Sequence, residues 1–312
     1  MMNNEKTPTK HQHIHSLAEE GNLNRNLILS IFLNILIVVA EIIGGLLSGS
    51  LALLSDALHN LSDVAALAIA WMARRFGKRP ASLRHTYGLK RLEVLAALLN
   101  SAILLVVSTL IVRESIVRLY HPEPVRGVLM LVVASIGLLA NLFSVLLLHS
   151  HAHDDLNLRS AFLHLAQDTL SSVLVIAAAL SLGLRFGVYF DPLVSLLVVV
   201  IIIRSGWNLM SETVHILLEG TPPGLDLELL QQDLQDHFPI RNLHHLHVWE
   251  VNSGQRLLTA HLVLDDCRLS DTEELLSRIR AHLAGGWAIN HATLEPEMKG
   301  CADQDLIKPI VT

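Results

Sequence analysis

Two short motifs in the sequence combine an imidazole and a carboxylate at the same spacing. His59 and Asp63 form the first His-x-x-x-Asp motif, and His164 and Asp168 form the second. Residues four apart on an α-helix lie about 40° apart around its axis, so each pair shares one helix face. Two imidazole nitrogens and two carboxylate oxygens suit tetrahedral Zn²⁺, whereas Mg²⁺ and Ca²⁺ prefer more oxygen ligands. If the two motifs meet, they predict a zinc site.

Both motifs lie in long apolar stretches, where ionisable groups are costly. An ionised Asp in the middle of a membrane costs about 2.5–3.5 kcal/mol, and a cation held jointly by both motifs would offset that cost. Protons compete with a metal for the same four side chains, which provides a physical basis for exchange of metal against H⁺. The alternative is a hydrogen-bonded contact within each helix. Recurrence of the pair in two separate stretches favours the metal site.

The composition indicates a membrane protein. The 312 residues are 51% hydrophobic and only 17% charged, whereas soluble domains carry about 25% charged residues. This excludes a disordered chain, a secreted disulfide scaffold and a soluble nucleic-acid binder. The net charge of −6 likewise provides no basic surface for nucleic acid. The 18 histidines are the second anomaly.

Six apolar stretches are long enough to cross a lipid bilayer, which takes about 20 residues. They are Leu27–Leu47, Leu51–Ala73, Leu92–Val112, Val128–Leu148, Ser160–Leu184 and roughly Val188–Leu209. The predicted fold is therefore a helical membrane protein. A cytoplasmic tail containing histidines (1–26) precedes six transmembrane helices (27–220), and a C-terminal domain (221–312) follows them.

Basic residues in the short loops predict the orientation of these helices. The loop at 74–91 carries seven Lys and Arg residues, which places it and both termini in the cytoplasm. The first apolar run has full span length, so no cleavable signal peptide is expected. The second and fifth spans are then antiparallel. At 1.5 Å per residue, Asp63 and Asp168 each lie about 18 Å from the outer surface, a depth compatible with their meeting.

The C-terminal 92 residues are typical of a soluble acidic domain, with 14 Asp and Glu against 7 Lys and Arg. Helices are expected at 225–238 and at 271–284, the second with Ser270 as its N-cap, and strands at 243–251, 257–264 and 287–294. This αββαβ order places two helices on one sheet face and leaves the other to water or to a second copy of the chain. Cys267 and Cys301 lie here, in a reducing compartment that disfavours a disulfide.

Four segments carry a family resemblance. Residues 49–63 (GSLALLSDALHNLSD) and 158–168 (LRSAFLHLAQD) resemble the second-span and fifth-span signatures of the cation diffusion facilitator family. Residues 244–249 (HHLHVW) and 291–297 (HATLEPE) resemble its cytoplasmic motifs. The resemblance extends from about residue 25 to residue 301 and is strongest to the bacterial zinc-exporting branch.

This resemblance implies a homodimeric inner-membrane antiporter, not an enzyme, that exports Zn²⁺ in exchange for H⁺. It also implies a metallochaperone-like fold for the C-terminal domain. Histidine at the first position of both motifs favours Zn²⁺, with Cd²⁺ as a second candidate. The implied transport site consists of His59, Asp63, His164 and Asp168.

The resemblance implies a second, regulatory zinc site in the cytoplasmic domain. Its ligands would be His244, His261 and His291, with Glu297 and Cys301 as further candidates. In a regular strand, His245 and His247 would point to the opposite face from His244.

Other polar residues have weaker expected roles. The stripe of Asp56 and Asn60 is expected to support packing or hydration, and Glu41 to form an interhelical hydrogen bond. From their positions in the sequence, we expect a charge contact between Arg91 and Glu219.

Two histidine tracts suggest loose capture of metal, with solvated polar segments as the alternative. They are His11, His13 and His15 in the tail, and His149, His151 and His153 before the fifth span. Two rival functions also remain at this point: a membrane-embedded zinc enzyme with one ligand position open to water, and a membrane-anchored metal sensor.

Overall fold

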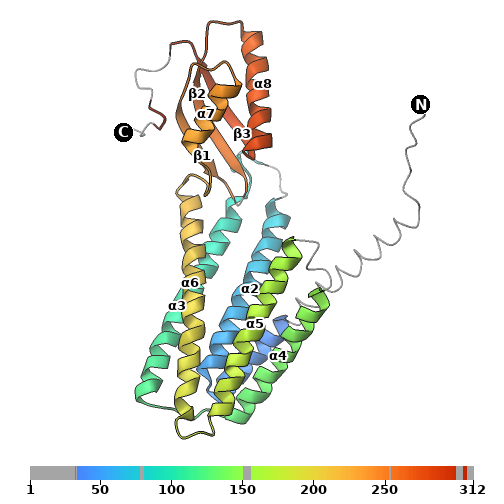
Figure 1. The fold of residues 1–312 in the computed structure, drawn as a ribbon, viewed down its shortest axis with the longest axis vertical. Helices are drawn as coiled ribbons and strands as arrows, with labels where there is room; N and C mark the ends of the chain where they lie inside the picture. The colour runs from blue at the N-terminus through green and yellow to red at the C-terminus, as the bar shows by residue number, and fades with distance from the viewer. Residues whose placement is uncertain are drawn as a thin grey trace, which may run out of the picture. The chain divides into compact units, whose positions relative to one another are not determined.

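The computed structural model describes residues 32, 34–77, 81–149, 156–252, 254–299 and 305–307 (Figure 1). A helical segment, Asn34–Ser48, comes first. It is followed by α2 (Leu51–Gly77), α3 (Arg91–Tyr120), α4 (Gly127–His149), α5 (Leu156–Ser181), the short 3-10 helix η1 (Gly187–Tyr189) and α6 (Phe190–Leu217). The chain forms two compact units, one of Met1–Ala68 with Asn100–Trp207, the other of Ile69–Leu99 with Asn208–Thr312.

Two helices in the described part of the chain are both long and apolar enough to cross a membrane. They are Arg91–Tyr120, and Gly187–Leu217, which includes η1. Asn34–Ser48, Gly127–Phe143 and Asp168–Ser181 are shorter apolar helices. Helix α2 is continuous from Leu51 to Gly77, but its apolar sequence includes the polar residues of the His-x-x-x-Asp motif. Two of the six predicted spans thus correspond to helices that are long and apolar enough to cross a membrane. The total of six remains a prediction.

The start of α2 is held by a carboxylate from α6. Asp191, which is fully buried, accepts hydrogen bonds from the Ser50 hydroxyl (2.5 Å) and from the backbone N–H groups of Leu51 (2.9 Å) and Ala52 (3.3 Å). The first N–H groups of a helix have no partner within the helix, and they form the positive end of its dipole. Asp191 therefore acts as an N-cap supplied by another helix, 141 residues away from Ser50.

Buried serines join three of the helices. The hydroxyl of Ser195 on α6 lies 2.8 Å from that of Ser55 on α2 and 3.1 Å from that of Ser115 on α3. All three side chains are buried. Small hydroxyl residues allow helices to approach closely and to hydrogen-bond across their interface. These contacts and the Asp191 cap fix α2, which carries His59.

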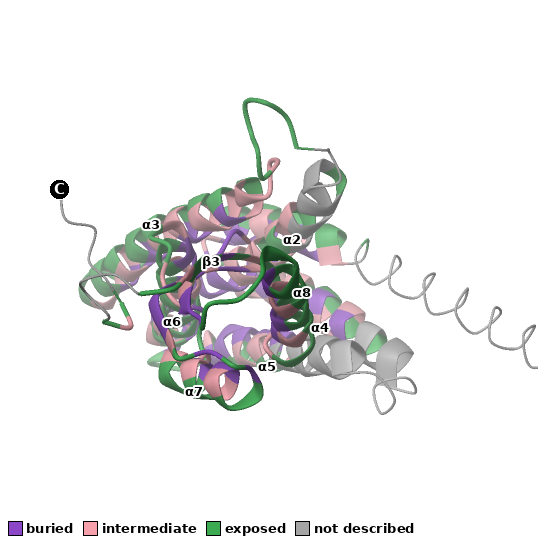
Figure 2. Cartoon of the chain, turned by 90° about the horizontal axis from the view of Figure 1, so that it is seen from above, coloured by how far each residue is buried: buried purple, intermediate pink, exposed green. Residues whose placement is uncertain are grey.

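The C-terminal domain, which the sequence places in the cytoplasm, has the predicted αββαβ order. Its elements are α7 (Leu227–His237), β1 (Asn242–Glu250), β2 (Arg256–Val263), α8 (Leu269–Gly286) and β3 (Ile289–Glu297). The sheet order is β1-β2-β3, with β1 antiparallel and β3 parallel to β2. Leu234 of α7, Leu283 of α8 and Leu258 of β2 share one core, so both helices cover the same sheet face. The outer side of α8 is exposed (Figure 2).

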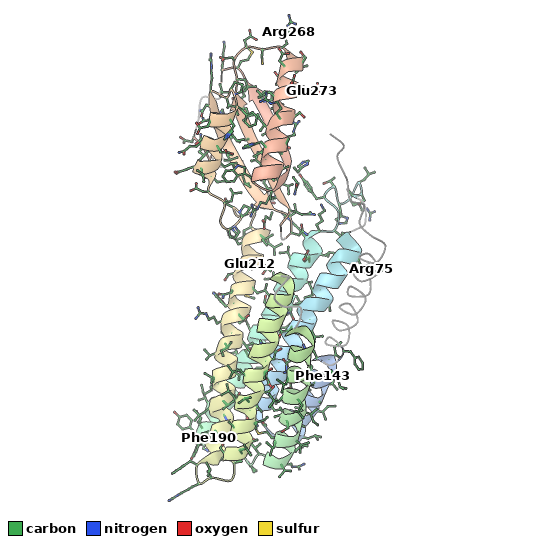
Figure 3. All side chains as sticks on the ribbon, turned by 45° about the vertical axis from the view of Figure 1, so that its right-hand side comes forward. Arg75, Phe143, Phe190, Glu212, Arg268 and Glu273 are labelled. Carbon is green, nitrogen blue, oxygen red and sulfur yellow. The ribbon has the colours of Figure 1, made fainter. Side chains whose placement is uncertain are left out.

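Two details of this domain differ from the prediction. Helix α8 begins at Leu269 with Arg268 at the N-cap, and no side chain caps it. Ser270 lies inside the first turn and donates to Asp271 instead (3.1 Å), so its assignment as the N-cap is wrong. Arg268 and Glu273 mark this exposed start of α8 (Figure 3). Strand β3 continues three residues past its predicted end, because its pairing with β2 extends to the Val263–Glu297 pair.

The expected charge contact is present in the unit that contains Ile69–Leu99. Arg91 Nη2 lies 2.9 Å from Glu219 Oε1, with 39% and 62% of the two side chains exposed. Exposed ion pairs contribute about 0–1 kcal/mol. The contact is therefore a weak tie between the start of α3 and the segment after α6.

Candidate metal sites

His59 on α2 lies between two carboxylates. Its Nδ1 atom is 3.9 Å from Asp63 Oδ2, one turn further along α2, and its Nε2 atom is 3.4 Å from Asp168 Oδ1 on α5. One ligand atom from each of the three residues lies within 4.8 Å of the others. The structure thus brings together three of the four side chains predicted to form the transport site. His164 belongs to α5, but its side chain is outside the described residues.

The burial of these groups differs. The Asp168 side chain is completely buried, whereas His59 and Asp63 are 23% and 25% exposed. A buried carboxylate is costly unless a cation or hydrogen-bond donors compensate it. The side chains of His59 and Asp63 are only partly shielded, so the three ligand groups differ in their access to the surroundings.

The neighbouring carboxylates are engaged by hydrogen-bond donors. Asp56 accepts hydrogen bonds from the Ser171 and Ser172 hydroxyls of α5, the second at 3.4 Å. Glu41 accepts one from the Asn60 side-chain amide (2.9 Å). These contacts match the expectation that Asp56 supports packing and that Glu41 forms an interhelical hydrogen bond.

A second group of potential ligands lies on the sheet of the cytoplasmic domain. His244 of β1 and His261 of β2 are cross-strand partners with ring centroids 5.3 Å apart. Glu297, at the end of β3, reaches both: Oε1 is 2.6 Å from His261 Nδ1, and Oε2 is 3.4 Å from His244 Nε2. Glu295 Oε2 lies 3.4 Å from His261 Nε2. The Nδ1 atom of the fully buried His244 has no hydrogen-bond partner within the described part of the chain.

A β-bulge adds His245 to this group. The register of β1 against β2 shifts between His244 and His247, and His245 has a positive φ of 49°. As a result, the His245 ring lies 4.7 Å from the rings of both His244 and His261. The expectation that His245 faces away from His244 is wrong, because it assumed a regular strand. A bulge places two residues opposite one and re-aims a side chain.

One further predicted ligand, His291, is not brought to this group. His291 is exposed on β3, where it pairs with Leu257 and its ring lies 6.3 Å from that of Tyr87. The residue of β3 that faces His261 is Glu295, four positions later. Cys301 and the histidines at 11, 13, 15, 151 and 153 lie outside the described residues, as does the side chain of His149. Sequence reasoning missed Glu295 and His245. Glu295 could have been found, because it lies two residues before Glu297 and therefore on the same face of a strand.

Both parts of the chain match family models. The cation efflux transmembrane domain matches residues 27–218, and the cytoplasmic domain of cation efflux proteins matches residues 222–297. Among curated proteins, the zinc transporter ZitB of Pectobacterium atrosepticum is 43% identical over 293 residues, which cover 93% of this chain and 90% of the relative. ZitB of Escherichia coli K12 is 40% identical over 297 residues, which cover 95% of this chain and 94% of the relative.

A more distant relative carries a broader name. The cadmium, cobalt and zinc/H(+)-K(+) antiporter of Bacillus subtilis is 37% identical over 282 residues, which cover 89% of this chain and 90% of the relative. The matches span the helices that carry His59 and Asp168 as well as the sheet that carries His244 and His261. From matches over this length we conclude that the chain belongs to the cation efflux family, the cation diffusion facilitators that its motifs resemble.

Proposed function

We propose that this protein exports Zn²⁺ from the cytoplasm across the inner membrane in exchange for protons, as a homodimer. The observation that carries the proposal is the convergence of His59, Asp63 and Asp168 from α2 and α5. The names of the relatives support zinc as the cargo, and that of the Bacillus relative supports Cd²⁺ as a second cargo and H⁺ as the counter-ion. All are named as transporters or antiporters, which favours transport over a membrane-embedded zinc enzyme.

The charge of the site explains how one set of ligands can serve both ions. Two carboxylates, Asp63 and Asp168, balance the two charges of Zn²⁺, so the loaded site is formally neutral. Protonation of both carboxylates also makes the metal-free site neutral. The metal-free, ionised form carries two negative charges in an apolar domain, which is the costly state. Zn²⁺ and protons therefore exclude each other at the same atoms. His164 on α5 would complete a tetrahedral set.

The proposed membrane topology also allows the two motifs to meet. Six transmembrane helices with cytoplasmic termini put α2 and α5 in opposite directions. The excess of Lys and Arg in the loop between α2 and α3 supports that orientation. An antiparallel pair brings residues from near the middle of each helix to the same depth.

In the cytoplasmic domain, we assign His244, His261 and Glu297 to a regulatory Zn²⁺ site, with His245 as an additional ligand. The buried His244 Nδ1 atom supports this assignment, because a buried imidazole nitrogen without a hydrogen-bond partner is costly unless it binds an ion. Glu295 and Cys301 are further candidate donors. His291 would not ligate the same ion, since it lies apart on β3.

Replacing the two carboxylates tests the transport site. Asp63→Asn and Asp168→Asn should each abolish Zn²⁺ uptake, driven by a pH gradient, into everted vesicles. Asp56→Asn is the matched control, because it removes the same charge from the same helix while the amide oxygen can still accept from Ser171. It should retain Zn²⁺ uptake in the same vesicle assay. Undiminished transport in both Asp63→Asn and Asp168→Asn would contradict the site assignment.

A flux assay tests the coupling. Purified protein in proteoliposomes should move Zn²⁺ faster with a pH gradient than without one. Equal fluxes would refute proton exchange, and no flux in either condition would leave an enzyme or a membrane-anchored sensor as the better interpretation. Replacing His244 and His261 with Gln should lower the bound metal and reduce activation by Zn²⁺ without removing the transport pathway.

A further inference from the structure

A third group of metal-binding side chains lies on the helices of the cytoplasmic domain. Asp233 and His237 are one turn apart on α7, and His282 is on α8. His237 Nδ1 lies 2.8 Å from the Asp233 backbone carbonyl oxygen, to which it can donate, and 3.0 Å from Asp233 Oδ1; this leaves Nε2 as the metal-binding nitrogen of His237. Asp233 Oδ2 is 2.7 Å from His282 Nε2. One ligand atom from each residue lies within 4.8 Å of the others. Each carboxylate oxygen thus faces a different imidazole.

Aromatic neighbours fix the orientation of these side chains. The Trp287 indole N–H donates to Asp233 Oδ2 (2.7 Å), the same oxygen that faces His282. The ring of Phe238 packs edge-on against that of His282, with centroids 5.4 Å apart. The two imidazole rings lie 5.0 Å apart. A carboxylate held by a neighbouring N–H group is the kind of second-layer contact that orients metal ligands.

This group is separate from the sheet cluster at His244 and His261. On β2, Leu258 and Leu262 point into the core beneath α7 and α8, so His261, which alternates with them, points to the opposite face. Asp233, His237 and His282 lie at the helix side of the sheet. They are also outside the four segments that carry the resemblance to the family.

The chemistry of the three donors favours a borderline divalent cation. Two imidazoles and one carboxylate suit Zn²⁺ better than Mg²⁺ or Ca²⁺. The hydrogen bond from Trp287 lowers the pKa of Asp233 from its ordinary value of 3.8, against the opposing effect of partial burial, and His282 lowers it further. The side chains of Asp233, His237 and His282 are 21%, 59% and 29% exposed, so an ion can enter from the cytoplasm.

We propose that Asp233, His237 and His282 form a second cytoplasmic metal site, which binds Zn²⁺ and links α7 to α8. Three protein ligands leave a fourth position open to water. The site exchanges its ion with the cytoplasm, and an ion bound there joins the two helices that cover the sheet. The site does not depend on the transport ligands or on the sheet cluster.

The test is the number of Zn²⁺ ions bound by the full-length protein in detergent, measured by equilibrium dialysis. His237→Gln and His282→Gln should each lower the stoichiometry by one ion per chain, while Zn²⁺ transport in vesicles persists. Asp236→Asn is the matched control, because it removes an exposed carboxylate from the same helix, and it should retain the full stoichiometry. The transport assay also shows that each variant is folded.

Two results would overturn the proposal. The first is an unchanged stoichiometry in the double variant His237→Gln/His282→Gln. The second is a loss with His282→Gln but none with His237→Gln, because the proposed site requires both imidazoles. The expected loss should also add to that of His244→Gln, which removes a ligand on the other face of the sheet. Failure of this site would leave the transport proposal intact, because the variants at Asp63 and Asp168 test that proposal separately.

Discussion

Removing the Asp191 carboxylate should strongly destabilise the helical unit that carries the proposed transport site. Asp191→Ala would leave two backbone N–H groups, those of Leu51 and Ala52, and the Ser50 hydroxyl without their acceptor. An ordinary exposed N-cap is worth about 0.5–2 kcal/mol. Leaving a buried donor unsatisfied costs about 1–3 kcal/mol, more when the lost partner is charged. The Ser50 hydroxyl can reorient, so the two N–H groups dominate. We expect a loss of about 3–5 kcal/mol in the free energy of unfolding.

The measurement is the denaturant dependence of helical circular dichroism in mixed micelles. Asp191→Asn retains one carbonyl oxygen and should cost about 1–2 kcal/mol. Asp226→Ala provides the matched control, since Asp226 caps α7 through two similar bonds of 3.0 and 3.1 Å but is exposed. A destabilisation by Asp191→Ala no larger than that by Asp226→Ala would refute the reasoning from burial. Zn²⁺ transport should also fall, because His59 lies about 12 Å further along α2.

Three further predictions concern the rest of the chain. Arg91→Gln should lower the free energy of unfolding by less than about 1 kcal/mol, and 1 M salt should remove the difference; a larger or salt-independent loss would contradict the assignment to an exposed ion pair. His245→Val should cost about 1–2 kcal/mol more than His245→Asn in thermal melts, because a branched side chain is strained at positive φ. In chelator-treated protein, the lowered pKa of Asp233 should add stability that is complete above pH 3.8 and lost as the pH falls through the folded-state pKa; melts of Asp233→Asn should lack this acid-dependent loss.

Local patterns predicted most of the cytoplasmic domain. Alternating apolar residues in β2 and the helical spacing of Leu230 and Leu234 identified the elements in their correct order, because each element buries one face. The start of α8 was misplaced because Ser270 is a good N-cap by type, whereas the helix begins at Leu269. Residue type alone does not determine at which residue the first helical turn begins.

Contacts between distant residues were harder to predict. The four-residue spacing of His59 and Asp63 puts both on one helix face. The estimated depths of Asp63 and Asp168 in the membrane were compatible with contact between the two motifs. The bulge at His245 depends on the pairing of β1 with β2, and the position of His291 depends on the register of β3 against β2. A one-residue change of register moves a side chain to the other face. The face to which each side chain points is therefore determined by how two strands pair, and it cannot be deduced from the sequence of one strand.

The cap on α2 has a consequence for the order in which the protein is made. Ser50 precedes Asp191 by 141 residues. At about 5–20 residues per second, the ribosome needs roughly 7–28 s to reach the aspartate after the serine. During that interval, the start of α2 lacks the carboxylate that satisfies it in the finished structure. The helix bearing His59 therefore reaches its final arrangement only after the start of α6 has been synthesised. Assembly of the proposed transport site is thus a late event in the biosynthesis of the protein.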